Sequence, residues 1–382
     1  MSSFLGLSHT GARNLRSDCM KFLIKLILFI SFSVLNLRVS NASEIYEAYT
    51  GARELAMGGA YVNTVNDETS LELNPAGLGK LRSKIITVAD PELDLGGKDQ
   101  KIFSGNNNYL GLIDPNVVYA NSKIDPSDHY HMKLQFLPSI VLPDFGIGIH
   151  AMRRIDADTD ATATNFHLDY TQDVDAVLGV NFKFFGGVLK VGVAGRYVDH
   201  SVVSQDFVIA STSSISIPQS GTEGTGLGVN IGGVITIPVE YLPSIGFTVH
   251  DVGNTSYNLS SGSFYQGGTG RPPDTIQTID GGLAFFPIVG GHTRSTFTAE
   301  VHDIATLSQE KSFLRRFHAG GEVNIGDILF LRAGMNQSFY TAGIEFASER
   351  MQFQVTTYGE DIGTSAAARE DRRFLGKFAF RF

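Results

Sequence analysis

The sequence predicts an all-β protein, a transmembrane antiparallel β-barrel of about 14 strands. Three observations predict it: a signal peptide near the N-terminus, regular alternation of apolar and polar residues through most of the chain, and an aromatic C-terminal strand. Composition agrees, because 42 Gly, 27 Phe and 13 Tyr among 382 residues suit bent, closely packed strands better than long helices. Composition alone fits a large soluble β-sandwich equally well.

Residues 20–42 form the predicted signal peptide. Lys21 and Lys25 precede an apolar stretch that runs to Leu35, and Ser40-Asn41-Ala42 is a small-residue cleavage site. The apolar stretch is too short for a membrane-spanning helix, which needs about 20 residues. Residues 1–19 lack such a pattern, so we interpret them as a misassigned upstream extension and Met20 as the initiator.

Export places the protein outside the cytoplasm and excludes cysteine-based sites and nucleic-acid binding. The one cysteine, Cys19, lies upstream of Met20, so the exported chain would carry no thiol for a disulfide or a metal. Removing residues 1–42, with five basic residues and one acidic residue, changes the net charge from -9 to -13. An acidic exported chain without basic clusters is a poor partner for nucleic acid. We expect it in the bacterial outer membrane.

Alternation with a period of two runs through residues 81–382, the predicted barrel. Ala176 to Phe184 and Leu189 to Tyr197 each place apolar side chains on one face, and Gly186-Gly187 joins them as a tight hairpin. We count 14 to 16 such segments from Ile85 onward, and an even number near 14 fits the length. The longest external loops are expected at 199–225 and 254–274.

The last strand carries a second signal. In the C-terminal sequence FLGKFAFRF, Phe378, Phe380 and Phe382 share one face, whereas Lys377 and Arg381 share the other. Three exposed phenylalanines would promote aggregation of a soluble edge strand, but in a barrel they face lipid. This ending looks like the signal that the barrel assembly machinery reads in outer-membrane proteins.

Two N-terminal motifs resemble the FadL superfamily of outer-membrane proteins, including its PorV-like branch. The first, GARELAMGGA, begins at Gly51, and the second is Asn74-Pro75-Ala76-Gly77-Leu78. The stretch from Leu331 to Arg373 looks more like the PorV-like branch. The resemblance implies a 14-stranded barrel whose N-terminal segment, residues 43–80, forms a hatch inside the lumen, with hatch residues Gly58, Gly59, Asn74, Pro75 and Ala76.

The resemblance also implies a passage for hydrophobic or amphipathic small molecules such as long-chain fatty acids. PorV-like members include secretion-system components that bind exported proteins, so a docking or shuttle barrel without transport is the alternative. The expected partners are outer-membrane lipid, the barrel assembly machinery during biogenesis, and either a hydrophobic small molecule or a secretion-system protein.

The polar faces of the strands supply candidate lumen residues. They include both signs of charge, which indicates a charge-paired, water-accessible interior or a network that only holds the barrel's shape. These candidates are Arg196, Glu300, His302, His318, Glu322, Arg332, Glu345, Lys377 and Arg381.

The catalytic and metal-binding patterns in the sequence are incomplete. Asp156, Asp158 and Asp160 begin like a calcium loop, but the required Gly and Glu are missing further on. His129 and His131 share a strand face without an evident third ligand, which favours a structural role. No nucleophile elbow or metalloprotease helix occurs. We therefore predict no enzymatic activity, no cofactor and no metal.

Overall fold

The structure is a computed structural model that describes residues 47–97, 99, 114–123, 129–160, 162–259, 270–291, 293–308, 312–363 and 368–382. The predicted upstream extension 1–19, the signal peptide 20–42 and residues 43–46 lie outside the described residues. Within the described part of the chain, no helix is both long and apolar enough to span a bilayer.

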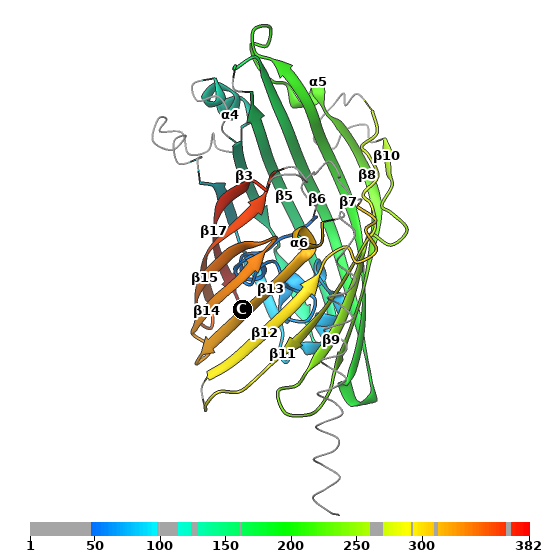
Figure 1. Cartoon of the computed structure of the whole chain (residues 1–382). Coiled ribbons are helices and arrows are strands. Elements are labelled where there is room, and N and C mark those ends of the chain that lie inside the picture. Colours follow the sequence, from blue (N-terminus) through cyan, green and yellow to red (C-terminus); the bar gives the residue numbers. More distant parts are fainter. Residues whose placement is uncertain are drawn as a thin grey trace, which may run out of the picture.

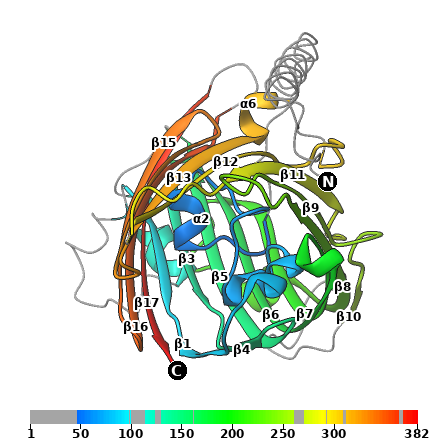
Figure 2. The same ribbon diagram turned by 90° about the horizontal axis from the view of Figure 1, so that it is seen from below.

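The described strands form one continuous sheet that closes on itself into a barrel (Figure 1, Figure 2). All the pairings are antiparallel, and the last strand pairs with the first two through Lys377 opposite Glu92 and Arg381 opposite Thr87. The strands are β1 (Ile85–Ala89), β2 (Glu92–Gly96), β3 (His129–Phe136), β4 (Ser139–Leu142), β5 (Phe145–Thr159), β6 (Asn165–Phe184), β7 (Leu189–Val208), β8 (Thr222–Thr236), β9 (Ser244–His250), β10 (Tyr257–Leu259), β11 (Thr278–Phe285), β12 (Thr293–Val301), β13 (Phe317–Ile325), β14 (Leu329–Asn336), β15 (Phe339–Ala347), β16 (Met351–Asp361) and β17 (Glu370–Arg381).

Three pairs of these segments are each one barrel strand with an interruption. The barrel therefore has 14 strands, as the sequence predicted. Asp90-Pro91 separates β1 from β2, Leu137-Pro138 separates β3 from β4, and residues 251–256 separate β9 from β10. Proline has no N–H to donate to a sheet. A side-chain bond replaces the lost ladder contact, because the backbone N–H of Leu137 donates to Asp90 Oδ1 at 2.6 Å.

The connections differ between the two ends of the barrel. At one end short turns join β4 to β5, β6 to β7 and β13 to β14, and the chain also ends there. The other end carries the longer connections, including α4 (Pro115–Ser122), α5 (Ile217–Ser220) and α6 (Phe313–Arg316). Short turns face the periplasm and long loops face outward in outer-membrane barrels, which orients the molecule.

Apolar side chains point outward around the barrel. Leu178, Leu227 and Phe297 are each about half exposed or more, whereas the alternate residues on the same strands are buried. Phe378 and Phe382 also face outward, and Lys377 and Ala379 face the lumen. This outward arrangement is the one expected of a wall in contact with lipid.

The expected loop at 199–225 is wrong in its extent. β6 and β7 are 20 residues long each, and β7 continues to Val208 before the chain turns back into β8 at Thr222. Their outward side chains at the outer end pack beneath α4, where Val118 and Tyr119 cover Phe166, Leu168 and Tyr170. The sequence of residues 199–208 is polar and does not indicate the outer part of β7. This part of the wall is covered by protein, so it needs no alternation of lipid-facing apolar residues.

Candidate functional site

An N-terminal segment occupies the lumen of the barrel. Residues 47–81, which we call the lumenal segment, contain α2 (Ala52–Ala56) and the 3₁₀ turns η1 (Glu68–Leu71) and η2 (Pro75–Lys80). Seen from the periplasmic end, these turns lie within the ring of strands (Figure 2). Leu71, Leu73 and Leu78 are almost fully buried against the wall.

Inward glycines of the strands make room for this segment. A Cβ on Gly192 of β7 would overlap the backbone of Pro75 and Ala76, and one on Gly232 of β8 would overlap the Asn74 side chain. On the opposite wall, Gly320 and Gly334 lie against Met57 in the same way. The glycine-rich strand sequences are therefore explained in part by close approach to the lumenal segment.

Gly58 and Gly59 turn the chain sharply after α2. Both have left-handed backbone conformations, with φ of +76° and +82°, which a residue with a side chain adopts only at a cost. A Cβ on Gly58 would also overlap the carbonyl oxygens of Ala319 and Met335. The geometry requires glycine at these two predicted hatch positions for a local, physical reason.

Asn74 and Pro75 begin η2. The Asn74 carboxamide accepts a hydrogen bond from the N–H of Ala76 at 3.0 Å, the usual role of a cap. The same side chain donates to the carbonyl of Val62 at 2.6 Å, so it also links η2 to an earlier part of the lumenal segment. Pro75 fits the first position of the turn because no N–H is needed there.

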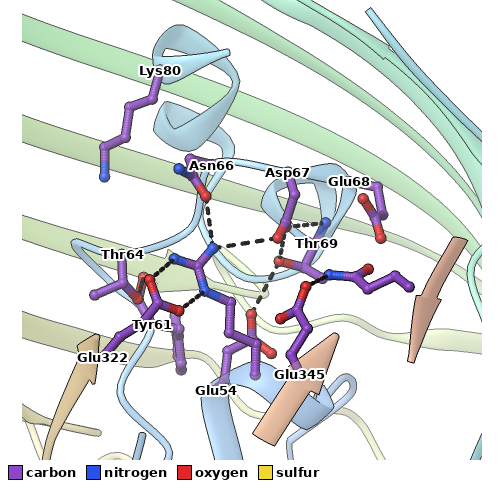
Figure 3. A network of polar contacts seen from close by, with 12 residues as sticks. Glu54, Tyr61, Thr64, Asn66, Asp67, Glu68, Thr69, Lys80, Glu322 and Glu345 are labelled. Carbon is purple, nitrogen blue, oxygen red and sulfur yellow. Dashed lines mark hydrogen bonds and ion pairs between the residues drawn. The ribbon is translucent and has the colours of Figure 1, made fainter. Parts of the chain in front are cut away.

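Arg53 binds the lumenal segment to the wall. Its Nε lies 3.1 Å from Glu322 Oε2 and a second nitrogen lies 3.2 Å from Oε1, an arrangement in which two parallel bonds form. Figure 3 labels Glu322 and marks both contacts with dashed lines. Arg332 donates to the same Glu322 carboxylate at 2.7 Å and also pairs with Glu345. A carboxylate of β13 is thus shared between the segment and β14.

Glu300 of β12 binds the backbone of the lumenal segment. Its carboxylate accepts from the N–H groups of Tyr61 at 2.7 Å and Val62 at 2.9 Å. His302 stacks on His318 with ring centroids 3.8 Å apart, and His318 donates to the carbonyl of Gly58 at 2.8 Å. Both histidines are buried and contribute to fixing the segment in place.

The remaining predicted lumen residues also face inward. Lys377 lies 2.7 Å from Glu92 and 3.6 Å from Asp90, and Arg381 pairs with Glu68 of the lumenal segment. All nine candidates from the polar strand faces therefore point into the lumen, and most contact the lumenal segment or a partner of it.

Charges inside the lumenal segment are perturbed by burial. Burial, and then the neighbouring Asp67, raises the pKa of the Glu54 carboxyl to about 7. Burial, and then Asp175, raises the pKa of Glu72 to about 7. Both carboxyls change charge near neutral pH.

Glu72, His150 and Asp175 are the residues best placed to hold a metal within the described parts of the chain. Their donor atoms lie within 4.8 Å of one another, and all three are buried. Arg196 lies 3.5 Å from Glu72 and 3.8 Å from Asp175, and it is held by Asp251 at 2.7 Å. Because a guanidinium already supplies positive charge there, the arrangement is explained as an ion-pair cluster.

A cavity of about 1000 Å³ lies in the barrel on the outer side of the lumenal segment. Tyr49, Tyr61 and Glu72 of the segment form part of its floor. Its walls come from the inward faces of β5 to β9, and the loop residues Pro273 to Ile276 lie near its mouth. We call this space the lumenal cavity.

Sequence reasoning missed several residues of this interior. Asp280 accepts a hydrogen bond from Tyr61, and Glu68 pairs with Arg381. Arg53 lies within the GARELAMGGA motif, whose sequence does not indicate an ion pair with the wall. Period-two alternation around Asp280 could have placed that residue, but the lumenal segment has no such period.

The aspartates of the calcium-like motif and the histidines His129 and His131 contact one another or the nearby backbone. Asp156 and Asp158 lie on β5, and they contact His131 at 2.5 Å and His129 at 3.0 Å. Asp160 accepts the N–H of Thr164 in the turn after the strand. This strand geometry differs from a calcium-binding loop, and each histidine has a carboxylate neighbour.

Solved structures share this fold. The CymD monoaromatic hydrocarbon channel is 10% identical over 87% of this chain and 96% of that chain, with a TM-score of 0.51. A deltaS2 mutant of the TodX monoaromatic hydrocarbon channel is 11% identical over 87% and 98%, with a TM-score of 0.53. A Pseudomonas aeruginosa FadL homologue is 10% identical over 90% and 98%, with a TM-score of 0.43.

The chain is thus a closed 14-stranded antiparallel β-barrel. Its fold is shared with the hydrocarbon channels, which confirms the expected barrel fold. No model of a protein family matches the sequence, and no curated protein matches it. Membership of the PorV-like branch stays a prediction.

Proposed function

We propose that this protein is an outer-membrane passage for hydrophobic or amphipathic small molecules. The observation that carries the proposal is the lumenal cavity, which lies inside a closed 14-stranded barrel and ends at the lumenal segment. A cavity of about 1000 Å³ has the size of a small-molecule site. The shared fold of the hydrocarbon channels supports a small hydrophobic cargo.

The lumenal segment acts as the hatch of this passage in our proposal. It lies below the cavity, and it contacts the wall both through an apolar cluster that includes Leu71 and Leu78 and through buried polar contacts such as Arg53 to Glu322. Gly58, Gly59 and the Asn74-Pro75-Ala76 turn would set its path.

Deletion of residues 51–78 tests the hatch. The purified full chain and the deletion variant would be compared in planar lipid bilayers. We expect the deletion variant to fold, as judged by its β-sheet circular dichroism, and to conduct ions continuously while the full chain conducts little. A deletion variant that fails to form a barrel would show that the segment is part of the wall.

The docking alternative calls for a different result from the same preparation. A barrel that serves a secretion system would co-purify with a stable exported protein and would bind no small amphipath. The passage predicts bound lipid or detergent in the lumen, found by mass spectrometry of the purified protein, and no stoichiometric protein partner.

Biogenesis follows the same proposal. The exported chain would begin after the signal peptide 20–42, and the face of Phe378, Phe380 and Phe382 would be read by the barrel assembly machinery. The outward position of Phe378 and Phe382 supports contact with outer-membrane lipid. The absence of enzymatic activity stays a prediction.

A further inference from the structure

The lumenal cavity carries an excess of acidic groups. Among the described residues that line it are nine carboxylates, three arginines and four histidines, and no lysine. Even if every one of the four imidazoles carried a proton, the carboxylates would outnumber the positive groups by nine to seven. With neutral imidazoles the excess is larger.

Ion pairs offset part of this excess, because Arg271 pairs with Asp274 and Arg373 lies 3.7 Å from Asp156. Arg154 lies 3.0 Å from Asp156, and Arg196 lies 2.7 Å from Asp251. The third arginine, Arg315, is held by Asp361, which does not line the cavity, at 3.3 Å. Arg196 also lies 3.5 Å from the cavity residue Glu72, so these three arginines face more carboxylates than they number.

Two carboxylates near the mouth are open to an entering molecule. The side chains of Asp158 and Asp169 are 48% and 46% exposed. Asp158 lies 3.0 Å from His129 and 3.9 Å from Arg369, and Asp169 lies 3.2 Å from His167. Inside a barrel, low-dielectric walls concentrate the field of such charges and raise the local concentration of oppositely charged solutes. A solute of the same sign is kept out by the same field.

Apolar groups share the lining with the acids. Leu73 and Tyr61 from the lumenal segment and Val202 and Ile276 from the outer part of the barrel line the same space. The cavity therefore offers contacts both to a short hydrocarbon and to a polar head group.

From these features we infer that the lumenal cavity selects neutral or cationic amphipaths and excludes carboxylates such as fatty-acid anions. The inference rests on the proposed passage and names its substrate class. An uncharged hydroxyl donates to a carboxylate, an ammonium group forms an ion pair with it, and an ionised carboxylate is repelled by it.

A matched series of eight-carbon probes tests the inference. Octanol, octylammonium and octanoate share one tail and differ in the charge of the head. Their binding to the full exported chain in nanodiscs would be measured by calorimetry at neutral pH, with protein-free nanodiscs as the control for partition into lipid. We expect octanol and octylammonium to bind. We expect octanoate to bind at least about tenfold more weakly than octanol.

Salt and charge reversal identify the cause. In about 500 mM salt the difference between octanoate and octanol should shrink compared with about 20 mM, because exposed charges are screened. The pair of substitutions Asp158→Lys and Asp169→Lys should also shrink it. Glu349→Lys, in the exposed turn between β15 and β16, makes the same change of charge outside the cavity and should leave it unchanged.

The outcomes separate the two ideas. If octanol binds and octanoate binds equally well at low salt, the charge selectivity is wrong and the passage stands. If none of the three probes binds above the protein-free control, the proposed passage fails and the selectivity fails with it. The salt comparison uses the natural chain, so it decides the question even if the reversed variant does not fold.

Discussion

Arg53 of the lumenal segment and Glu322 of β13 are 269 residues apart in the sequence and form a two-bonded ion pair, with Nε to Oε2 at 3.1 Å. The pair joins the segment to the wall opposite β7, where Gly192 receives η2. The segment is thus held on two sides of the lumen, by charge on one and by close backbone contact on the other.

Removal of the Arg53 side chain should release the segment. Arg53→Ala leaves Glu322 facing one arginine fewer, and breaking one partner of a buried ion pair costs about 3 kcal/mol. Ser70→Cys, at a buried position, reports release by maleimide labelling in a chain that begins at Ser43. We expect roughly a hundredfold more labelling with Arg53→Ala.

Arg294→Ala serves as the control for that prediction, because Arg294 pairs with Asp327 at 2.9 Å on the exposed periplasmic side. Exposed pairs contribute little to stability. Equal labelling of Ser70→Cys in the two variants would contradict the role of Arg53.

A side chain at Gly192 should displace η2. In Gly192→Ala the new methyl group would overlap the backbone of Pro75 and Ala76, so the turn has to move. On the same strand Gly195→Ala is a matched control, because a Cβ there meets no atom within 4 Å. We expect ion conductance in planar bilayers to rise for Gly192→Ala only. Unchanged conductance in both would argue against close contact at η2.

The segment should be held more weakly as the pH rises. The pKa of Glu54 is about 7 in the docked state and 4.5 ordinarily, so the docked state binds more protons between these values. Stability of docking is therefore highest below about pH 4.5 and is lost up to about pH 7. Glu72 acts in the same direction.

Labelling of Ser70→Cys at several pH values measures this dependence, after division by the rate of an exposed cysteine. The double variant Glu54→Gln and Glu72→Gln removes both titrating groups and should give a nearly flat profile. A rise that persists in the double variant would place the pH dependence in other groups.

The exported protein should begin at Ser43 and contain no cysteine. Intact-mass spectrometry of protein purified from the outer membrane gives the mature N-terminus directly. A mass that includes Cys19 would overturn both the cleavage site and the assignment of Met20 as initiator.

Loss of the terminal aromatic should impair insertion into the outer membrane. Phe382 is exposed at the end of the chain, so Phe382→Ala changes little of the interior. We expect less protein in the outer membrane at equal synthesis, whereas Phe297→Ala, a similar outward aromatic within β12, should insert normally. Equal amounts of both would show that the last residue is not read during assembly.

The barrel was predictable because its physical cause repeats in every strand. Leu178 and Leu227 face lipid, and their neighbours face the lumen, so a period of two is imposed residue by residue. The outer ends of β6 and β7 escaped this reasoning. Phe166 and Leu168 there lie under α4, and the sequence near Val208 resembles an ordinary polar loop.

For the interior, the sequence predicts which side chains point inward but not which residues they contact. Glu322 and Arg332 could be placed inward from alternation, but their partners could not be chosen, because a contact between distant strands depends on register and on the path of the lumenal segment. Arg53 lies on a five-residue helix with no period to read. The lumenal cavity depends on both and was invisible in the sequence.

The unequal height of the wall has a geometric consequence. β6 and β7 have 20 residues each and β14 has 8, which corresponds to about 65 Å against about 27 Å along the strand. The outer rim of the barrel is therefore higher on the side of β6 and β7 than on the side of β14 (Figure 1). For the proposed passage, this means that a molecule adsorbed at the cell surface would cross the rim beside β14, where the wall extends least far.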